Sequence, residues 1–240
     1  MILNELHQLA INAAKETGSF LLENKFSKKE IYQEEGRDIK LKIDRQSEVL
    51  IREMLENSGL GVFGEEYGGQ INNDEDFWVI DPLDGTSNYF RGIDQCCVAI
   101  SLMNRDTAKI GVIYNFNSGE LFTAYTGGGA YLNGNRISVS NIEKKEKASL
   151  TTGFPASESI ESSSRYLESF SGWNKIRMFG SAALSCAYVA SGRCDVYQEK
   201  GVYLWDFAAG ICLVEEAGGK AIYKKIDDSR YSVNFTNGRL

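Results

Sequence analysis

The segment from Asp81 to Thr86, with the sequence DPLDGT, places two carboxylates directly behind the apolar run at 77–80. Such a run predicts a buried strand. A tight turn at its end, stiffened by the fixed backbone angle of Pro82, would aim both carboxylates at one point. Paired carboxylate oxygens on a rigid bend suit Mg²⁺. The next two amides can face a phosphate at the start of a helix, so the segment predicts a metal beside a phosphate, as phosphate ester hydrolysis requires.

Further acidic residues lie at the ends of other predicted elements. They are Asp44 at the head of a helix, Glu65 and Glu66 after a short apolar segment, Glu199, and Asp206 at the start of a late helix. Taken singly, Asp44 and Asp206 are suited to capping a helix, and Glu65 and Glu66 to an exposed turn. The segment from Asp81 to Thr86 is the hardest to explain by packing, because it combines carboxylates, proline, glycine and a hydroxyl in six residues.

The side-chain chemistry of the rest of the chain narrows the mechanism. His7 is the single histidine and lies near the start of the first predicted helix, which favours a surface or helix-packing role. A Ser-His-Asp or Cys-His mechanism would have to recruit it, and no nucleophile motif is near. The five cysteines lack Cys-x-x-Cys spacing, so they are expected to be buried small hydrophobes rather than disulfides or zinc ligands. Catalysis would therefore use carboxylates, hydroxyls and metal.

Length and charge set broader bounds. The 240 residues fit one large domain or two small ones, and the net charge is −7. Because a phosphate backbone repels an acidic protein, no nucleic-acid partner is expected. No apolar run approaches the roughly 20 residues of a membrane span, and the first residues do not look like a secretory signal. We therefore expect a cytoplasmic protein with no membrane partner.

The pattern of apolar residues predicts the elements that must position these side chains. In the first half it indicates helices at 3–23 and 44–57, a loop or short strand at 28–35, and strands at 61–63, 77–80, 96–103 and 110–114, with a hairpin at 117–119. This half reads as two helices on a largely antiparallel sheet.

A charged stretch at 142–147 reads as a linker, so we place a domain boundary near Ser140, between 1–140 and 141–240. Beyond it the pattern indicates strands at 149–153, 175–178, 194–198 and 220–223, helices at 182–190 and 206–216, and a Ser/Glu-rich loop at 157–165. This alternation suggests an α/β second half.

Three blocks in order give the chain a family resemblance. GEE at 64–66, WVIDPLDGTSNY at 78–89 and WDFAAG at 205–210 resemble the signature blocks of the inositol monophosphatase family. The resemblance runs almost the whole length of the chain, and the middle block is highly specific. It implies an α+β fold, a layered α-β-α-β-α sandwich of two subdomains with the active site between them, and it implies a homodimer.

The resemblance also implies roles for individual residues. Mg²⁺, as two or possibly three ions, would be held by Glu65, Asp81, the Leu83 carbonyl, Asp84 and Asp206. Asp44 and Thr86, with Glu65, would be the catalytic residues that position or deprotonate the attacking water. The substrate would contact Asp84, Gly85, Thr86, Ser181, Ala182 and Glu199. Two metals about 4 Å apart can activate water and neutralise phosphoryl oxygens, so in-line hydrolysis to an alcohol and phosphate is expected.

The blocks identify the reaction better than the alcohol that is released. Inositol monophosphate is the first expected substrate, and fructose 1,6-bisphosphate, histidinol phosphate, another sugar phosphate and a nucleotide 3′-phosphate remain alternatives. We expect the choice between these substrates to depend on Lys40, Lys42, Arg177 and Lys200, although each of these residues is also suited to an exposed surface position. A different class of function, a regulatory binding protein on the same fold, also stays open, because some bacterial relatives act with the transcription machinery.

Overall fold

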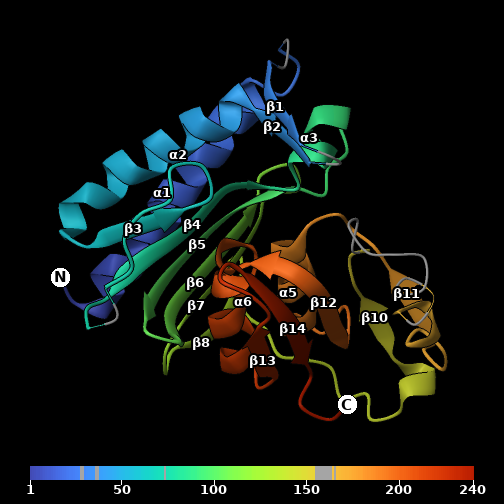
Figure 1. Ribbon diagram of the computed structural model, residues 1–240. Helices are drawn as coiled ribbons and strands as arrows, with labels where there is room; N and C mark the ends of the chain where they lie inside the picture. The colour runs from blue at the N-terminus through green and yellow to red at the C-terminus, as the bar shows by residue number, and fades with distance from the viewer. Residues whose placement is uncertain (28–29, 36–37, 73, 155–163, 165) are drawn as a thin grey trace.

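The computed structural model describes residues 1–27, 30–35, 38–72, 74–154, 164 and 166–240. It shows the predicted layered α+β sandwich (Figure 1). Two long helices cover one face of a seven-stranded sheet, a second pair of helices covers its other face, and a five-stranded sheet lies beyond that pair. The Ser/Glu-rich loop predicted at 157–165 falls almost wholly outside the described residues.

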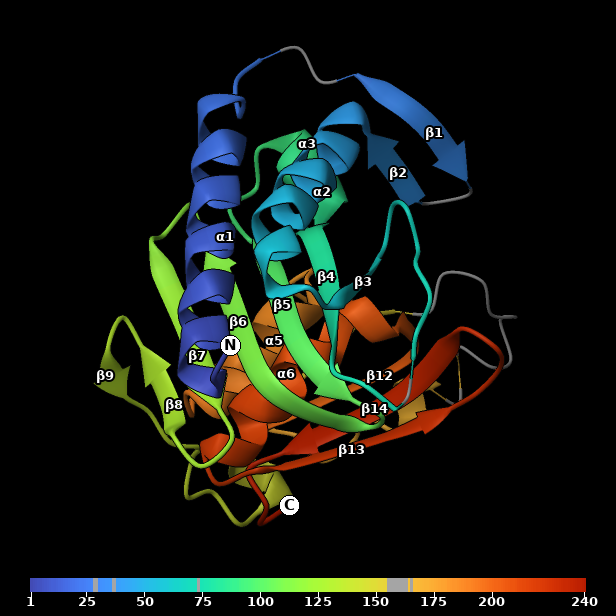
Figure 2. The ribbon, with the colours of Figure 1, turned by 90° about the vertical axis from the view of Figure 1, so that its left-hand side faces the viewer.

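The outer helices are α1 (Leu3–Glu23) and α2 (Lys42–Leu55), which lie side by side on the sheet (Figure 2). Apolar residues of α1 recur at helical spacing, and Leu6, Ala10 and Leu21 are buried against the sheet. His7 is buried on the same helix, with its ring centroid 5.1 Å from that of Tyr125. The expected helix-packing role of this histidine is confirmed.

The seven-stranded sheet follows the chain order and is antiparallel except for the parallel pair β3 and β4. Its strands are β3 (Gly61–Gly64), β4 (Phe77–Asp84), β5 (Cys97–Asn104), β6 (Thr107–Asn115), β7 (Glu120–Tyr125), β8 (Gly129–Leu132) and β9 (Asn135–Arg136). The short helices η1 (Glu56–Ser58) and α3 (Thr86–Arg91) precede β3 and follow β4. The predicted largely antiparallel sheet is confirmed.

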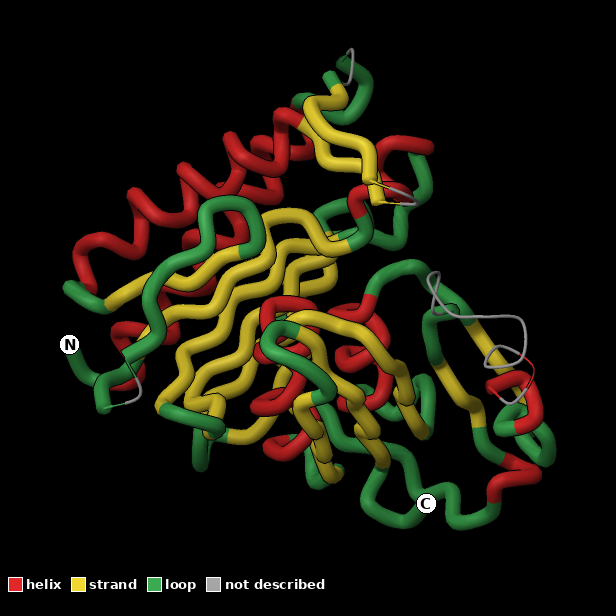
Figure 3. The backbone as a smooth tube through the Cα atoms, in the orientation of Figure 1, coloured by secondary structure: helices red, strands yellow, loops and turns green. Residues whose placement is uncertain are grey.

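Strand β4, which lies between β3 and β5 in the seven-stranded sheet (Figure 3), is buried along its whole length. Its side chains alternate, so that Trp78 and Ile80 pack with α1 and α2, while Phe77 and Val79 pack toward the second sheet. A strand covered on both faces reads as a continuous apolar run, which is why the sequence signal for β4 was clear. The polar end of this rigid strand therefore lies between the two halves of the molecule.

The second half has a mixed sheet in the order β11-β10-β12-β14-β13, parallel around β10 and antiparallel from β12 to β13. Its elements are η2 (Lys145–Lys147), β10 (Ser149–Thr151), β11 (Lys175–Arg177), α5 (Ala182–Ala190), β12 (Val196–Tyr203), α6 (Leu204–Glu216), β13 (Lys220–Lys225) and β14 (Arg230–Thr236). Residues of both halves share one hydrophobic cluster. The boundary near Ser140 stays a prediction.

Several element limits differ from those expected. Helix α2 begins at Lys42 and α6 at Leu204, so Asp44 and Asp206 lie inside the first turn of a helix instead of ahead of it. Strand β12 runs on to Tyr203 and therefore carries Glu199. The hairpin of β1 (Ile31–Glu35) with β2 (Asp38–Leu41), and strand β14, were recognised only in part or not at all, because their polar residues give no clear periodicity.

All five cysteines are free and buried, as expected for small core residues. Within the part of the chain that the structure describes, no helix has the length and apolar character needed to cross a bilayer.

Helix α6 packs so closely on β6 that a glycine is required at the contact. A Cβ atom at Gly111 would lie 2.2 Å from the carbonyl oxygen of Ala209, which is backbone and cannot turn away. We expect Gly111→Ala to lower the free energy of unfolding by about 2 kcal/mol or more, the cost of overpacking a rigid contact. Urea denaturation measures the difference.

Gly61→Ala is the matched control, because its Cβ would meet its nearest neighbour, the Gln70 carbonyl oxygen, at an ordinary 3.8 Å. It should leave stability within about 0.5 kcal/mol of the parent chain. Equal stability of the two variants would contradict the close approach of α6 to β6.

Candidate active site

Asp81 and Asp84 lie at the end of β4, on a strand that continues where a tight turn was predicted. Asp81 pairs with Ala99 and Asp84 with Cys97, so β4 carries one extra residue between the two pairs. The predicted turn is thus replaced by a β-bulge. Pro82 fits there because a bulge residue need not donate a ladder hydrogen bond. One oxygen of Asp81 accepts the amide of Leu83 at 3.0 Å.

Gly85 then turns the chain into α3. Its φ of +86° is left-handed, and a Cβ atom would stand 2.8 Å from the Gln95 carbonyl oxygen, so a side chain is excluded twice. The hydroxyl of Thr86 donates to the Leu83 carbonyl at 3.0 Å. Of the predicted metal and water-positioning groups, this strand end therefore brings Asp81, Leu83, Asp84 and Thr86 together.

The side chain of Asp84 joins the two halves of the molecule. One of its oxygens accepts the Ser181 hydroxyl, the Ala183 amide at 2.9 Å and the Cys97 thiol at 3.6 Å. The other accepts the Ala182 amide at 3.3 Å. Ser181 also caps α5 by accepting the Leu184 amide. Ser181 and Ala182 were predicted as substrate contacts. The structure places them on a predicted metal ligand, and contact with substrate stays a prediction.

Asn88 makes a second tie between the halves. Its side-chain amide donates to the carbonyls of Gln95 at 2.7 Å and Phe179 at 2.8 Å. It thus holds the loop before α5 against α3. The asparagine of the middle sequence block had no assigned role, and its contacts give it one.

Glu65 lies in the turn after β3, and a buried acid on α2 shapes that turn. The carboxylate of Glu48 accepts the amides of Glu66 at 2.7 Å and Tyr67 at 3.2 Å, and it pairs with Arg52 at 2.8 Å. Arg52 also donates to the carbonyl of Gly68 at 2.5 Å. Sequence reasoning missed Glu48, although its spacing of four residues from both Asp44 and Arg52 places all three on one face of a helix.

Asp44 is almost fully buried in the first turn of α2. One oxygen accepts the amide of Leu41 at 2.7 Å, which satisfies the capping role, and the other has no hydrogen-bond partner in the described structure. Burial raises the pKa of Asp44 to about 8. A buried carboxylate with a free oxygen can orient a water molecule and accept its proton.

Asp206 comes to the same region from α6, where its carboxylate accepts the Tyr203 amide at 2.7 Å. Burial raises the pKa values of Asp206, Asp81 and Asp84, and it raises that of Glu65 to about 7. Repulsion adds to the effect of burial: the charges of Glu65, Asp84 and Asp206 raise the pKa of Asp81, and those of Asp84 and Glu65 raise the pKa of Asp206. Three separate chain segments therefore bring four carboxylates within electrostatic range.

The four carboxylates do not converge on a single point in this structure. Among the described residues, no three His, Cys, Asp or Glu side chains are grouped so as to hold a metal ion. Asp81, Asp84 and Asp206 each direct an oxygen toward a protein donor. The donor set nevertheless fits a hard divalent cation, since burial raises the pKa values of these three acids and they form no ion pair among the described residues.

Glu199 lies on β12 and is hydrogen-bonded by the Tyr197 hydroxyl at 2.9 Å. Burial raises its pKa to about 7, and the charge of Asp84 adds to the shift. Gly153 lies so close that a Cβ atom there would be 1.9 Å from a Glu199 oxygen. Glu199 therefore borders the carboxylates, and its predicted contact with substrate stays a prediction.

The basic residues expected to select substrate differ in whether they reach the acidic residues of the site. Lys40 reaches the carboxylates of Glu65 and Glu66. Arg177 and Lys200 are exposed, on the edge strand β11 and on β12.

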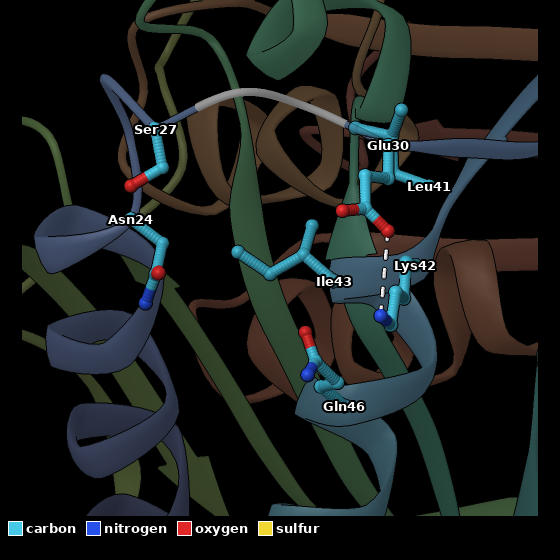
Figure 4. Close-up of a pocket in the computed structure, with 7 residues that line it drawn as sticks. All are labelled: Asn24, Ser27, Glu30, Leu41, Lys42, Ile43 and Gln46. Carbon is cyan, nitrogen blue, oxygen red and sulfur yellow. Dashed lines mark hydrogen bonds and ion pairs between the residues drawn. The ribbon is translucent and has the colours of Figure 1, made fainter.

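Lys42 faces a polar pocket of about 200 Å³ between α1 and α2, where it pairs with Glu30 at 3.3 Å (Figure 4). The pocket is lined by Asn24, Ser27, Glu30, Leu41, Lys42, Ile43 and Gln46. Apart from Lys42, the lining contains none of the predicted metal-binding, catalytic or substrate-contacting residues.

Known proteins are similar to this chain over most of its length. The model of the inositol monophosphatase family matches residues 2–229. The "Nus factor SuhB" of Xylella fastidiosa is 40% identical over 219 residues, which cover 88% of this chain and 79% of that protein. The "Inositol-1-monophosphatase" of a Synechocystis species is 38% identical over 221 residues, covering 87% of this chain and 76% of that protein.

A solved structure, the inositol monophosphatase of Anabaena, superposes with a TM-score of 0.84 at 32% identity, covering 99% of this chain and 92% of the other. With the family model spanning nearly the whole sequence, this chain belongs to the inositol monophosphatase family.

Proposed function

We propose that this protein is a Mg²⁺-dependent phosphomonoesterase with inositol monophosphate as its first substrate. The observation that carries the proposal is a set of four carboxylates from three chain segments: Asp81 and Asp84, which are buried, and Glu65 and Asp206, which are half-buried. Buried like charges are costly unless a cation balances them. Membership of a phosphatase family supports the same reading.

Each residue then has a task that its contacts support. The four carboxylates and the Leu83 carbonyl would hold two Mg²⁺ ions, which would supply activation of water and neutralisation of the phosphoryl oxygens. Asp44 offers its unpartnered oxygen to the attacking water and takes its proton. Because the Thr86 hydroxyl donates to Leu83, its oxygen is left to accept a hydrogen bond from the same water. The amides of Gly85 and Thr86 bind phosphate.

The alcohol is bound on the other side of the site. Glu199, with Ser181 and Ala182, lies where the second half meets Asp84. A carboxylate accepts hydrogen bonds from hydroxyl groups, so a polyol such as inositol or a sugar suits Glu199. Fructose 1,6-bisphosphate, histidinol phosphate and nucleotide 3′-phosphates are the competing substrates. A homodimer, as the family resemblance implies, belongs to the same proposal and can be tested by light scattering.

A regulatory binding role is the second candidate, and the name of the Xylella fastidiosa relative, "Nus factor SuhB", favours it. The two candidates separate in a strain that carries Asp206→Asn at the native locus. A regulatory role expects wild-type behaviour from that strain, whereas an enzymatic role expects the behaviour of a deletion.

Asp206→Asn should lower Mg²⁺-dependent phosphate release by at least a hundredfold. The asparagine keeps an oxygen that can accept the Tyr203 amide, so the start of α6 is retained while a metal ligand loses its charge. The measurement is phosphate release from a panel of phosphate monoesters, with and without Mg²⁺. Asp84→Asn should lose activity as well, and it should also lower stability, because the asparagine NH2 group cannot accept the hydrogen bond that the second carboxylate oxygen accepts from the Ala182 amide.

Asp94→Asn is the control, because Asp94 is an exposed acid that pairs with Lys25. It should keep the parent rate. Near-normal turnover of Asp206→Asn would remove Asp206 from the site, and the absence of Mg²⁺-dependent turnover on every ester would refute the enzymatic proposal.

The carboxyl groups also predict how stability depends on pH. Their pKa values are higher in the folded protein than in the unfolded chain, so the stabilisation is complete below about pH 4 and is lost as pH rises through the folded values, about 7 for Glu65. In EDTA the Tm should therefore fall between pH 5 and pH 8. Mg²⁺ binds the folded state and should restore Tm more at pH 8 than at pH 6.

Differential scanning fluorimetry across this pH range tests the expectation, with Ca²⁺-free buffer and matched ionic strength. A Tm in EDTA that rises from pH 5 to pH 8, or a larger Mg²⁺ effect at pH 6, would contradict the burial of uncompensated carboxylates.

A further inference from the structure

Lys40, at the end of β2, reaches across to the turn that carries Glu65. Its ammonium lies 3.0 Å from Oε1 of Glu66 and 3.6 Å from Oε1 of Glu65. The side chain of Glu66 is only 1% exposed and that of Lys40 is 30% exposed, so the Glu66 end of this ion pair is shielded from solvent. Figures 1 and 2 show the hairpin of β1 and β2 at the start of α2, and β2 lies next to α3.

The second oxygen of Glu66 is held by the same part of the molecule. It accepts the hydroxyl of Tyr32 on β1 and lies 3.7 Å from Arg45 on α2. The Arg45 guanidinium stacks over the Tyr32 ring at 4.0 Å. Glu66 thus has two cations and a hydroxyl around it, whereas Glu65 has one cation, Lys40, among the charged groups that act on it.

The three polar groups around Lys40 form a site for a cation. Two carboxylate oxygens converge on its ammonium, and the Tyr32 hydroxyl binds the other oxygen of Glu66. Oxygen donors in this arrangement suit a hard divalent ion as well as an ammonium. Although burial alone would lower the pKa of Lys40, Glu65 and Glu66 raise it, so the side chain remains charged.

We propose that Lys40 is the resident cation on one side of Glu65, where it positions that carboxylate and excludes an additional divalent ion from the space between Glu65 and Glu66. Lys40 is therefore a positioning residue that limits how many metal ions the carboxylates bind. The inference rests on the proposed function in one respect, the assignment of Glu65 as a metal ligand.

The direct test counts bound Mn²⁺ in the full chain by equilibrium dialysis, with free Mn²⁺ followed by electron paramagnetic resonance. Lys40→Gln should bind one more Mn²⁺ per chain than the parent protein, with weaker affinity than the others. Adding Glu66→Gln to that variant should remove the extra ion, because one of the two converging carboxylates is lost.

Two further variants control for charge and position. Lys40→Arg keeps the positive charge and should bind the same number of ions as the parent. Lys42→Gln removes the neighbouring lysine, which pairs with Glu30, and should also leave the number unchanged. An unchanged count in Lys40→Gln, or an extra ion in Lys40→Arg, would overturn the proposal.

A fifth variant gives a readout that does not need Lys40 to be replaced. In Glu66→Gln the ammonium faces Glu65 alone, so Mn²⁺ affinity at the Glu65 site should fall several-fold with no change in the count. Unchanged affinity would overturn the positioning role. If the parent binds Mn²⁺ and Lys40→Gln gains an ion, but no ester is hydrolysed, the proposed phosphatase fails while the role of Lys40 stands.

Discussion

Repulsion among four closely placed carboxylates is the constraint on which the rest of this structure depends. Asp81 and Asp84 are buried, Glu65 and Asp206 are half-buried, and the charges of Glu65, Asp84 and Asp206 raise the pKa of Asp81 beyond the effect of its burial. Such an arrangement costs free energy in the absence of a cation. The packing of the two sheets around α5 and α6 holds these carboxylates in place. The fold thus stabilises the site against the repulsion between its carboxylates.

Backbone amides at element ends carry much of that task. The start of α5 donates to Asp84, the residue before α6 donates to Asp206, and the residue before α2 donates to Asp44. Amides at these positions have no partner within the helix and carry a partial positive charge. Each carboxylate is thereby oriented, and at least one oxygen of Asp44 stays without a protein donor. The same contacts that fix the helices therefore also fix the orientation of these carboxylates.

How far the sequence could predict this site depends on whether a residue acts through its neighbours in the chain or through space. The segment from Asp81 to Thr86 was identifiable because its carboxylates follow a strand buried on both faces. Its bulge was not, since the extra residue is defined only by the pairing of β4 with β5. The layered α+β fold was also predicted, from the order of the elements and the family resemblance.

Contacts between segments that lie far apart in the sequence could not be predicted from local sequence patterns. Glu48 looks like any polar residue of an amphipathic helix, and its role appears only when the turn after Gly64 folds against it. Ser181 is typical of a helix cap, and it does cap α5. Its hydrogen bond to Asp84, in contrast, joins residues 97 positions apart. Lys40 belongs to a strand with no clear periodicity, so its approach to Glu65 depends on tertiary structure alone.

Anomalous diffraction from crystals soaked in Mn²⁺ tests the central claim most directly, because it locates each metal ion without an assay of activity. The account predicts two strong peaks between the halves of the molecule, ligated by the carboxylates of Glu65, Asp81, Asp84 and Asp206. Peaks confined to other acidic residues, or no peak within ligand distance of these four at saturating Mn²⁺, would contradict it.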